Sequence, residues 1–370
     1  MLIIPLKCAP RYDLREPLAR WLDGGPPGTV TNPLEFVHLR PDFKSCDCRD
    51  EIIRLASIRN CLSDSIAKPL SHKVALEDFA LQDCHEYHAA LLEFIKRGFP
   101  TRDEVTPSLK LSWKAAIGQQ TETHGSLEWD RACTIWNIAA LESYLASIQT
   151  SDKEGRKQAV KHCQTAASMM RYLHDEVVDG QGFETVDLSK PCLKFWEHCM
   201  LAHAQLATYQ LATCGETVKS MLATGAVPLF NEALQYSKHT LLVSHQLPTE
   251  EWSVHCKAWS MLLTSKAAHH QAMACQETHA WGYELGWLQE TLRSLTAANE
   301  FCSKNYTPLE KEINEMMQTV RVRLAQASKD NTGLYGEEIP TFLPNIQPKQ
   351  LVKSDGQLPD SMLTPKKALF

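Results

Sequence analysis

The residues best suited to chemistry in this 370-residue chain are its cysteines and its 15 histidines. The segment Cys84-His85-Glu86-Tyr87-His88 places Cys84 and His88 one helical turn apart, where a thiolate and an imidazole could bind zinc. A structural zinc site takes four ligands, and no second Cys/His pair with a fixed spacing accompanies this one. Histidines that pack in the core or lie on the surface are therefore the simpler interpretation.

Two other clusters favour metal binding even less. Cys46 and Cys48 are separated by a single residue, which is too close for the usual zinc pattern, and they follow a predicted loop. His269 and His270 lie in a predicted helix beside alanines, where packing explains them more simply than ligation. We expect no metal site in either place.

The common catalytic motifs are also absent from the sequence. It contains no phosphate-binding P-loop, no G-x-G-x-x-G fingerprint and no G-x-S-x-G nucleophile motif. A Cys–His nucleophile pair stays open as an alternative, although no feature of the sequence singles one out. We therefore expect a protein that is not an enzyme, without catalytic or cofactor-binding residues.

Composition indicates the broad class of the protein. The net charge of −6 argues against a general nucleic-acid binder, and the 44% hydrophobic residues are ordinary for a globular chain. The 13 cysteines are odd in number and often lie in apolar helical runs, which is typical of a reducing compartment. No secretory signal and no run of roughly 18 apolar residues is present. We expect a cytoplasmic protein that is a monomer and binds no nucleic acid.

The elements that must position any site are predicted to be helices, so the fold class is mainly all-α. Apolar residues recur at helical spacing over much of the chain after residue 50. The predicted helices span residues 74–97, 127–147, 153–178, 193–213, 218–242, 251–276, 280–305 and 309–328. A short N-terminal strand region, a Gly/Pro-rich surface loop over 23–50, a strand or extended link at 109–113 and a polar turn at 119–125 complete the first part.

Three local signals predict how individual helices begin. Ser151 and Glu154 form an S-x-x-E capping box. Thr307 is the expected N-cap of the last helix, with Pro308 at its first position. Pro228 interrupts the 218–242 helix, so a kink or a late start is expected there.

A weak repeat predicts a solenoid of paired helices. Residues 259–274 and 282–297 show the large-small-large packing pattern of a tetratricopeptide-like helix pair joined by a short turn. Stacked pairs of this kind curve and present a concave binding surface. The proline-rich tail after residue 330 lacks helical periodicity and is predicted to lie along the helices as an extended strap.

Several segments, in this order, resemble the Bro domain family, whose members include ALIX and the yeast Bro-one protein. Leu111-Ser112-Trp113-Lys114 is similar to the family's T-W-K-D turn, and CTIWNIAAL to its C-x-L-F-N-x-A-x-L helix. MLAHAQ matches M-L-A-Q-A-Q at all but one place. Further similar segments are the opening IPLK and DLREPL, the run 152–162, the run 329–340 and the LVK at 351–353. Their order and spacing together make the resemblance specific.

The resemblance implies an architecture and an activity. The fold would be an elongated, banana-shaped domain over 1–355, with core helices at about 127–328, a strap over 330–355 and a disordered or extended tail over 356–370. Its concave face would bind the C-terminal amphipathic helix of an ESCRT-III subunit, in endosomal or multivesicular-body sorting and membrane remodelling. Recruitment to endosomes, with peripheral contact to the endosomal membrane, would follow. The alternative is a signalling scaffold, like the pH-response and Rho-binding relatives.

Carrying the family's groove onto this sequence gives a mixed result. The groove lysine falls on Lys157, whereas an acidic residue of the family is replaced by Lys153. The aromatic anchor falls on Thr208, and of two aliphatic anchors one falls on Met221 and the other on Gly225. The implied groove residues are Lys157, Thr208, Tyr209, Leu211, Met221, Leu222 and Gly225.

Two further features have both a structural and a functional interpretation. Lys153, Arg156, Lys157 and Lys161 share a helix and form either a solvated face or a charged rim that meets an acidic helix or an anionic membrane. Tyr335 stands where some relatives carry a phosphorylated tyrosine, and it is otherwise expected to pack on the strap.

Overall fold

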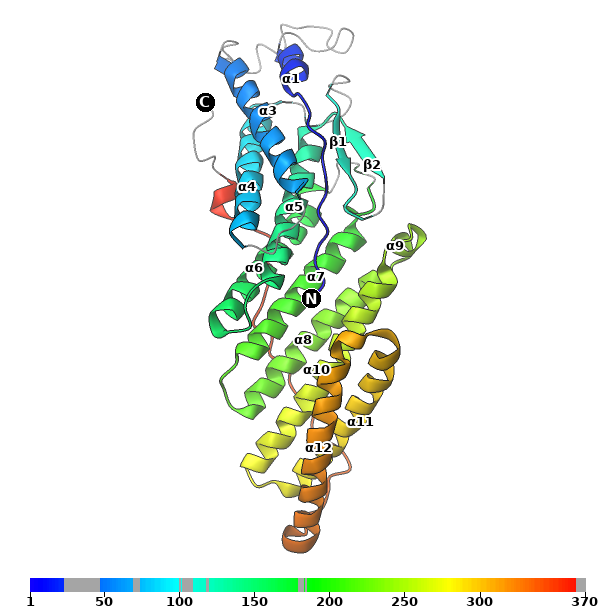
Figure 1. Cartoon of the computed structure of the whole chain (residues 1–370). Coiled ribbons are helices and arrows are strands. Elements are labelled where there is room, and N and C mark those ends of the chain that lie inside the picture. The colour runs from blue at the N-terminus through cyan, green and yellow to red at the C-terminus, as the bar shows by residue number, and fades with distance from the viewer. Residues whose placement is uncertain are drawn as a thin grey trace. The chain divides into compact units, whose positions relative to one another are not determined.

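The computed structural model describes residues 1–22, 47–68, 74–99, 101, 109–117, 120–178, 183 and 185–363. These residues are mainly helical, which confirms the predicted fold class (Figure 1). The first helices are α1 (Arg15–Leu22), α3 (Asp47–Ile66), α4 (Val74–Lys96), α5 (Leu127–Ser147) and α6 (Lys153–Tyr172). The later helices are α7 (Lys190–Leu211), α8 (Glu216–Ser237), α9 (Thr240–Ser244), α10 (Thr249–Glu277), α11 (Trp281–Asn305) and α12 (Glu310–Asp330).

The chain divides into two compact units, which are described separately. The N-terminal unit comprises Ile3–Ile148, Ser168–Leu193 and Asp355–Phe370. The C-terminal unit comprises Met1–Leu2, Gln149–Ala167 and Lys194–Ser354. Helices α6 and α7 each contribute residues to both units, and the predicted groove residues all belong to the C-terminal unit.

Helix α5 is the core of the N-terminal unit. Its start is fixed by Ser126, whose hydroxyl accepts the backbone N–H of Trp129 at 3.4 Å. Every residue of α5 from Leu127 to Ala146 except Glu128 is buried, so the helix needs neighbours on all sides. Helix α4 packs beside it and α3 packs on α4. The predicted bounds of 127–147 are confirmed.

Asp130 on α5 joins three elements of this unit through hydrogen bonds to its buried carboxylate. Arg59 of α3 donates from Nε at 3.0 Å and from Nη2 at 3.3 Å. The Tyr87 hydroxyl of α4 and the Trp113 indole N–H, which donates at 2.5 Å, complete the group. Burial together with the Asp130 charge raises the pKa of Tyr87 well above its ordinary value.

A β-hairpin takes the place of the polar turn expected at 119–125. Strand β1 (Leu111–Lys114) pairs antiparallel with β2 (Thr121–His124), so Ser112 lies opposite Thr123. The two side-chain hydroxyls are 2.7 Å apart. Residues 121–124 have a composition that favours a turn, but pairing with β1 stabilises them as a strand. Most of the loop predicted at 23–50 lies outside the described residues, but its last residues belong to α3.

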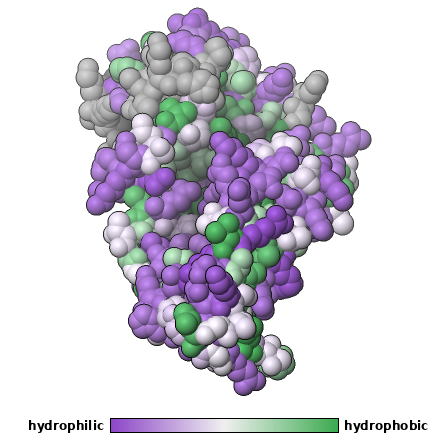
Figure 2. Space-filling view, turned by 60° about the horizontal axis from the view of Figure 1, so that its bottom comes forward, coloured by the Kyte–Doolittle hydropathy of each residue, from purple (hydrophilic) through white to green (hydrophobic). Residues whose placement is uncertain are grey.

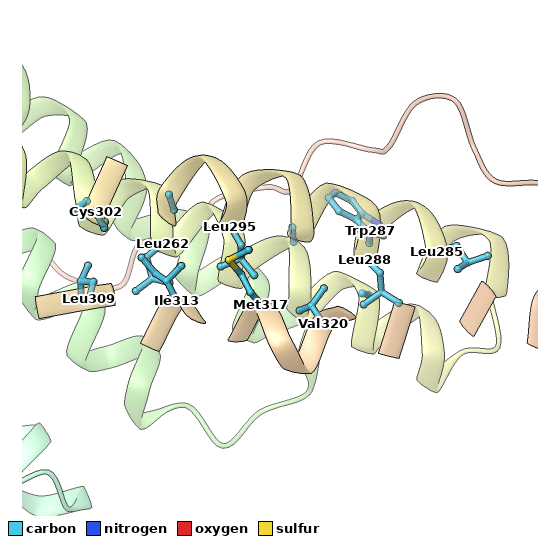
Figure 3. Packing of buried hydrophobic residues seen from close by; sticks show 14 of the residues in the cluster. Leu262, Leu285, Trp287, Leu288, Leu295, Cys302, Leu309, Ile313, Met317 and Val320 are labelled. Atoms are coloured by element: carbon cyan, nitrogen blue, oxygen red, sulfur yellow. The ribbon is translucent and has the colours of Figure 1, made fainter. Parts of the chain in front are cut away.

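The C-terminal unit is built around α10, α11 and α12. The helix pair predicted from the weak repeat is confirmed, because α10 ends at Glu277 and α11 begins four residues later at Trp281. Figure 3 shows side chains of the three helices meeting in one apolar layer, with Leu295 of α11 facing Ile313 and Met317 of α12. Burial of such side chains is the main source of stability in a solenoid.

Two helix starts in this unit differ from the sequence prediction. Thr307, Pro308 and Leu309 form a 3₁₀ turn, η3 (Thr307–Leu309), and α12 begins only at Glu310. Helix α8 begins at Glu216 and continues through Pro228, so the late start is wrong. The predicted 218–242 helix also ends early, at Ser237, and α9 follows as a separate element.

The strap after α12 lies close to the helices, as the sequence predicted. The π-helical turn η4 (Asn331–Tyr335) ends α12, and the side chain of Asn331 bonds both the N–H and the C=O of Glu337. The strap then passes the start of α11, where a methyl group at Gly282 would clash with the carbonyl oxygen of Glu338. Glycine therefore permits the close approach of the two backbones.

The tail after residue 355 differs from the disordered or extended segment predicted there. Residues 360–362 form the 3₁₀ turn η5 (Asp360–Met362), and the Met362 side chain is fully buried in the N-terminal unit. Its carbonyl oxygen is 2.9 Å from Nδ1 of His88. An apolar anchor thus holds at least this part of the tail, and residues 364–370 lie outside the described residues.

No helix in the described part of the chain is both long enough and apolar enough to cross a membrane. In the view of Figure 2, hydrophilic residues cover most of the surface and hydrophobic residues form small, separate groups.

We predict that Asp130→Ala strongly destabilises the N-terminal unit. The substitution leaves the Arg59 charge buried without its partner, and breaking a buried ion pair in this way costs about 3–5 kcal/mol. Urea unfolding followed by tryptophan fluorescence would measure the loss. Glu16→Ala, which removes only an exposed partner of Arg20, is the control and should change the midpoint little. Equal midpoints for the two variants would contradict the role of Asp130.

Candidate functional site

The predicted groove helices α6, α7 and α8 are crossed by the strap, and Gln205 of α7 fixes that crossing. Its buried amide donates to the carbonyl oxygens of Lys349 at 2.9 Å and Leu222 at 3.1 Å. Its Oε1 accepts the N–H of Leu351 at 2.9 Å. The Lys349 N–H donates in turn to the Met221 carbonyl oxygen at 2.8 Å. One side chain thus joins the strap to two helices.

Gly225 lies directly beneath the strap and does not line an open groove. A methyl group there would clash with the Lys349 carbonyl, and it would stand 3.1 Å from Nε2 of Gln205. Leu222, one turn earlier, is also buried. The position at which the resemblance implies an aliphatic anchor is therefore covered by the backbone of this chain itself, and Leu222 is not free to replace the missing anchor.

The remaining apolar residues of the predicted groove are half-buried on α7 and α8. Met221, Thr208 and Leu211 each expose part of their side chain. The Thr208 hydroxyl donates to the Ala204 carbonyl oxygen at 2.8 Å, so its polar atom is satisfied within α7. The Met221 carbonyl oxygen also accepts a hydrogen bond from the strap, and we call the three half-buried residues Thr208, Leu211 and Met221 the floor.

The Tyr209 hydroxyl takes part in a chain of hydrogen bonds within the protein. Its oxygen is 2.7 Å from Nε2 of His270, and Nδ1 of His270 is 2.5 Å from the Glu216 carboxylate. The Nδ1–H of His270 donates to the carboxylate, so Nε2 carries no proton and accepts the hydrogen bond from the tyrosine hydroxyl. Burial raises the pKa of Tyr209, which disfavours a nucleophilic tyrosinate. Tyr209, His270 and Glu216 are arranged in a line like a catalytic triad, but here their hydrogen bonds join α7, α8 and α10.

The basic residues of α6 lie along one side of the helix and are exposed, apart from Arg156. Lys153, Lys157 and Lys161 are spaced by four residues and therefore share a face. Lys157 pairs with Glu154 of its own helix at 3.1 Å. Arg156 instead donates to the Gln210 carbonyl oxygen at 3.3 Å, which ties α6 to the end of α7.

The start of α6 is capped differently from the prediction. Asp152, and not Ser151, accepts the Gly155 N–H at 2.8 Å, and its other oxygen accepts the Thr150 hydroxyl. These hydrogen bonds lower the pKa of Asp152. Glu154 turns outward to Lys157 and Gln158 instead of closing a capping box.

Leu351 is a candidate residue that sequence reasoning did not assign to the site. Its side chain is 56% exposed, although its backbone is fixed on Gln205. Lys349 and Lys353 flank it and are also exposed. The Leu-Val-Lys segment contributes to the family resemblance, but its place in the site follows only from the hydrogen bond between the Leu351 N–H and Gln205.

Tyr335 packs on the start of α11. Its ring stacks on Trp281 with the ring centroids 4.4 Å apart and the planes 11° apart, and the residue is 44% exposed. The packing role that the sequence offered is thus present, and modification of its hydroxyl stays a prediction.

The metal candidates of the sequence are engaged elsewhere. Both ring nitrogens of His88 have partners, since Nδ1 donates to Met362 and Nε2 accepts from Arg131 Nε at 3.3 Å. Cys84 is fully buried, and that burial raises the pKa of its thiol. The described residues contain no group of three or more potential metal ligands, and Cys46 lies outside them.

Comparisons with known proteins identify similar chains. The family model described as BRO1-like domain matches residues 40–370. The human Programmed cell death 6-interacting protein is 24% identical over 95% of this chain and 38% of its own length. The Vacuolar protein-sorting protein BRO1 of Gibberella zeae is 26% identical over 67% of this chain and 26% of its own. This chain therefore spans well under half the length of either relative.

A solved structure supports the same fold. The chain from the ALIX BRO1 CHMP4C complex superposes with a TM-score of 0.82, covering 100% of this chain and 99% of that one at 22% identity. The TM-score establishes that the two chains share a fold, whereas an identity of 22% does not transfer the roles of individual residues.

We predict that Gln205→Leu loosens the strap. The substitution removes the recorded partners of the Lys349 carbonyl oxygen and the Leu351 N–H, and each lost hydrogen bond of this kind costs about 0.5–1.5 kcal/mol. Hydrogen exchange of the Lys349 and Leu351 amides should accelerate by about tenfold or more. Gln164→Leu is the matched control, because Gln164 makes a single 3.3 Å bond to the strap and is half-exposed. Unchanged exchange in Gln205→Leu would contradict the clamp.

We also predict a pH dependence from His88. Burial, together with the nearby Arg131 charge, lowers its pKa from 6.5 to about 3. The unfolded chain therefore binds one more proton between these values, and stability falls as pH falls from about 6.5 to 3, at about 1.4 kcal/mol per pH unit. His88→Gln can keep both hydrogen bonds without titrating, so its urea-unfolding free energy should depend less on pH.

The control for this measurement is His279→Gln, which changes an exposed histidine. Its stability should follow the wild-type pH dependence. If His88→Gln shows the same slope as His279→Gln, His88 does not contribute in the stated way.

Proposed function

The chain belongs to the BRO1-like domain family, and we propose that it is a non-catalytic module whose C-terminal unit binds the C-terminal amphipathic helix of an ESCRT-III subunit. The resemblance to the Bro domain family noted in the sequence is thereby confirmed. The proposal extends to a role in endosomal or multivesicular-body sorting with recruitment to endosomes. A name of one relative, Vacuolar protein-sorting protein BRO1, supports that role.

The observation that supports this function best is the floor beside a row of lysines. Helix-in-groove recognition needs a strip of apolar contacts spaced along a helix and charges at its edge that set the register. Met221, Leu211 and Leu351 supply exposed or half-exposed apolar surface, and Lys157 stands on the neighbouring helix. The partner CHMP4C is named with the ALIX BRO1 chain, which shares this fold.

The same residues predict a weaker apolar contact than the family pattern implies. Thr208 offers a methyl group in place of an aromatic ring, and Gly225 is covered by the strap. Burial of one Leu-sized side chain contributes roughly 1.5–3 kcal/mol, so each missing anchor removes about a tenfold to hundredfold factor in affinity. Leu351 supplies part of the missing apolar surface.

We predict that a C-terminal helical peptide of CHMP4C binds the chain and that Met221→Asp or Leu351→Asp weakens binding at least about tenfold. Each change places a charge against the apolar stripe of the peptide and removes buried apolar surface. Lys157→Asp should weaken binding less, because its contact lies at the exposed rim. Isothermal titration calorimetry would measure the dissociation constants.

Val322→Asp is the matched control for these variants. Val322 is 68% exposed on α12, outside the floor, so the change introduces the same charge without touching the proposed site. Equal effects of Val322→Asp and Met221→Asp would contradict the proposed site. Absence of binding to this peptide and to the equivalent helices of the other ESCRT-III subunits would reject the proposed function and favour the signalling-scaffold alternative.

A further inference from the structure

The lysines beside the floor form one continuous row on the C-terminal unit. Lys153, Lys157 and Lys161 follow each other at intervals of four residues on one face of α6, and all three are exposed. Four helical residues rise by about 6 Å, so the row covers about 12 Å along the helix axis. Gln164 takes the next place on this face, and its amide donates to the carbonyl oxygen of Lys353 at 3.3 Å. The strap thus adds a fourth lysine to the end of the row.

The charges of this row are available for a partner. The structure records no ion pair for Lys153, Lys161 or Lys353 within the residues it describes. Lys157 contacts Glu154 at 3.1 Å, but both side chains are more than half exposed, and such pairs are exchanged at little cost. Asp152, the nearest acidic residue before the row, uses its two oxygens for the Gly155 N–H and the Thr150 hydroxyl and forms no recorded ion pair with these lysines in the described part of the chain.

We propose that this site selects a helix whose apolar stripe is bordered on one side by carboxylates at positions i, i + 4 and i + 8. The inference rests on the proposed helix-binding function and adds the charge pattern of the partner. A helix that crosses α6 at about −50°, the angle at which the i, i + 4 rows of two helices run parallel, repeats its side chains with the same spacing as the lysine row, so that successive carboxylates meet successive lysines. Lys153 and Lys353 mark the two ends of the row and therefore define where the acidic border begins and ends.

A helix fits this row better than an anionic membrane does. The lysines repeat at intervals of four residues on one helix, and the strap is held against the same helix by the hydrogen bond from Gln164 to Lys353. A lipid surface has no such repeat and would favour cations spread over a flat face. The order of the charges along the row, as well as their number, should therefore determine affinity.

The test uses two designed amphipathic helical peptides with the same apolar stripe. One carries Glu at the i, i + 4 and i + 8 border positions, and the other carries Gln there. Fluorescence anisotropy with the full chain at low salt should show binding of both, with the Glu peptide on the order of tenfold tighter. The difference should shrink as salt is raised, because exposed pairs are screened.

Charge reversal then tests the register. Lys153→Glu and Lys161→Glu should each remove about threefold of the preference, and a peptide with Lys at the one facing border position should restore binding to the matching variant only. Lys304→Glu is the control, since it changes the net charge equally at an exposed position on α11. It should leave the preference for the Glu peptide unchanged.

The outcomes separate the two proposals. If both peptides bind equally well, or if Lys304→Glu acts like Lys153→Glu, the charge rule is overturned and helix docking stands. If neither peptide binds while the CHMP4C peptide does, the charge rule is overturned and the proposed function stands; if the CHMP4C peptide and the other ESCRT-III helices also fail to bind, both proposals fail. If the lysine variants lose binding to phosphatidylserine vesicles but keep the preference for the Glu peptide, the row serves a membrane and the charge rule is again overturned.

Discussion

The candidate site depends on one buried amide, that of Gln205. A strap without secondary structure must still satisfy its backbone N–H and C=O groups where it is covered, because an unpaired buried group costs as much as a lost hydrogen bond. Gln205 carries both a donor and an acceptor, so it serves the Lys349 carbonyl and the Leu351 N–H with one side chain. Gly225 makes this possible by removing the side chain that would keep the strap away from α8.

Polar hubs of the same kind organise both units. In the N-terminal unit, Asp130 collects donors from α3, α4 and the strand β1, and α5 is thereby fixed among elements distant in sequence. In the C-terminal unit, Glu216 and His270 hold Tyr209 where the ends of three helices meet. Each hub is almost fully satisfied, which is the condition under which a buried polar group specifies one packing instead of destabilising it. Apolar layers such as that of α10 to α12 supply most of the burial, and the hubs determine the register.

Sequence patterns predicted the helices well because helical periodicity is a local signal. The bounds of α5, the turn between α10 and α11, and the strap followed from residues close to one another in the chain. The failures share a different origin. Strand β2 forms only because it pairs with β1. Asp152 caps α6 in place of Ser151, because its two oxygens accept the Gly155 N–H and the Thr150 hydroxyl. Met362 anchors the tail through a contact with His88 on a helix some 270 residues earlier. None of these long-range or competing contacts is encoded in the periodicity of a single segment.

The candidate site combines residues that local sequence patterns predicted with contacts between segments distant in the sequence. Motif order assigned Lys157 and Met221 to the candidate site, but it gave no indication that the strap covers Gly225 or that the Leu351 backbone is bound by Gln205. With Thr208 in place of an aromatic ring, the apolar contact is narrow. When the apolar contact is small, charged contacts account for a larger part of the difference in affinity between partners. Each exposed charged contact contributes little energy, but it favours only a partner that has the opposite charge at the matching position. In the proposed helix docking, the spacing of Lys153, Lys157 and Lys161 would therefore supply specificity that the floor lacks.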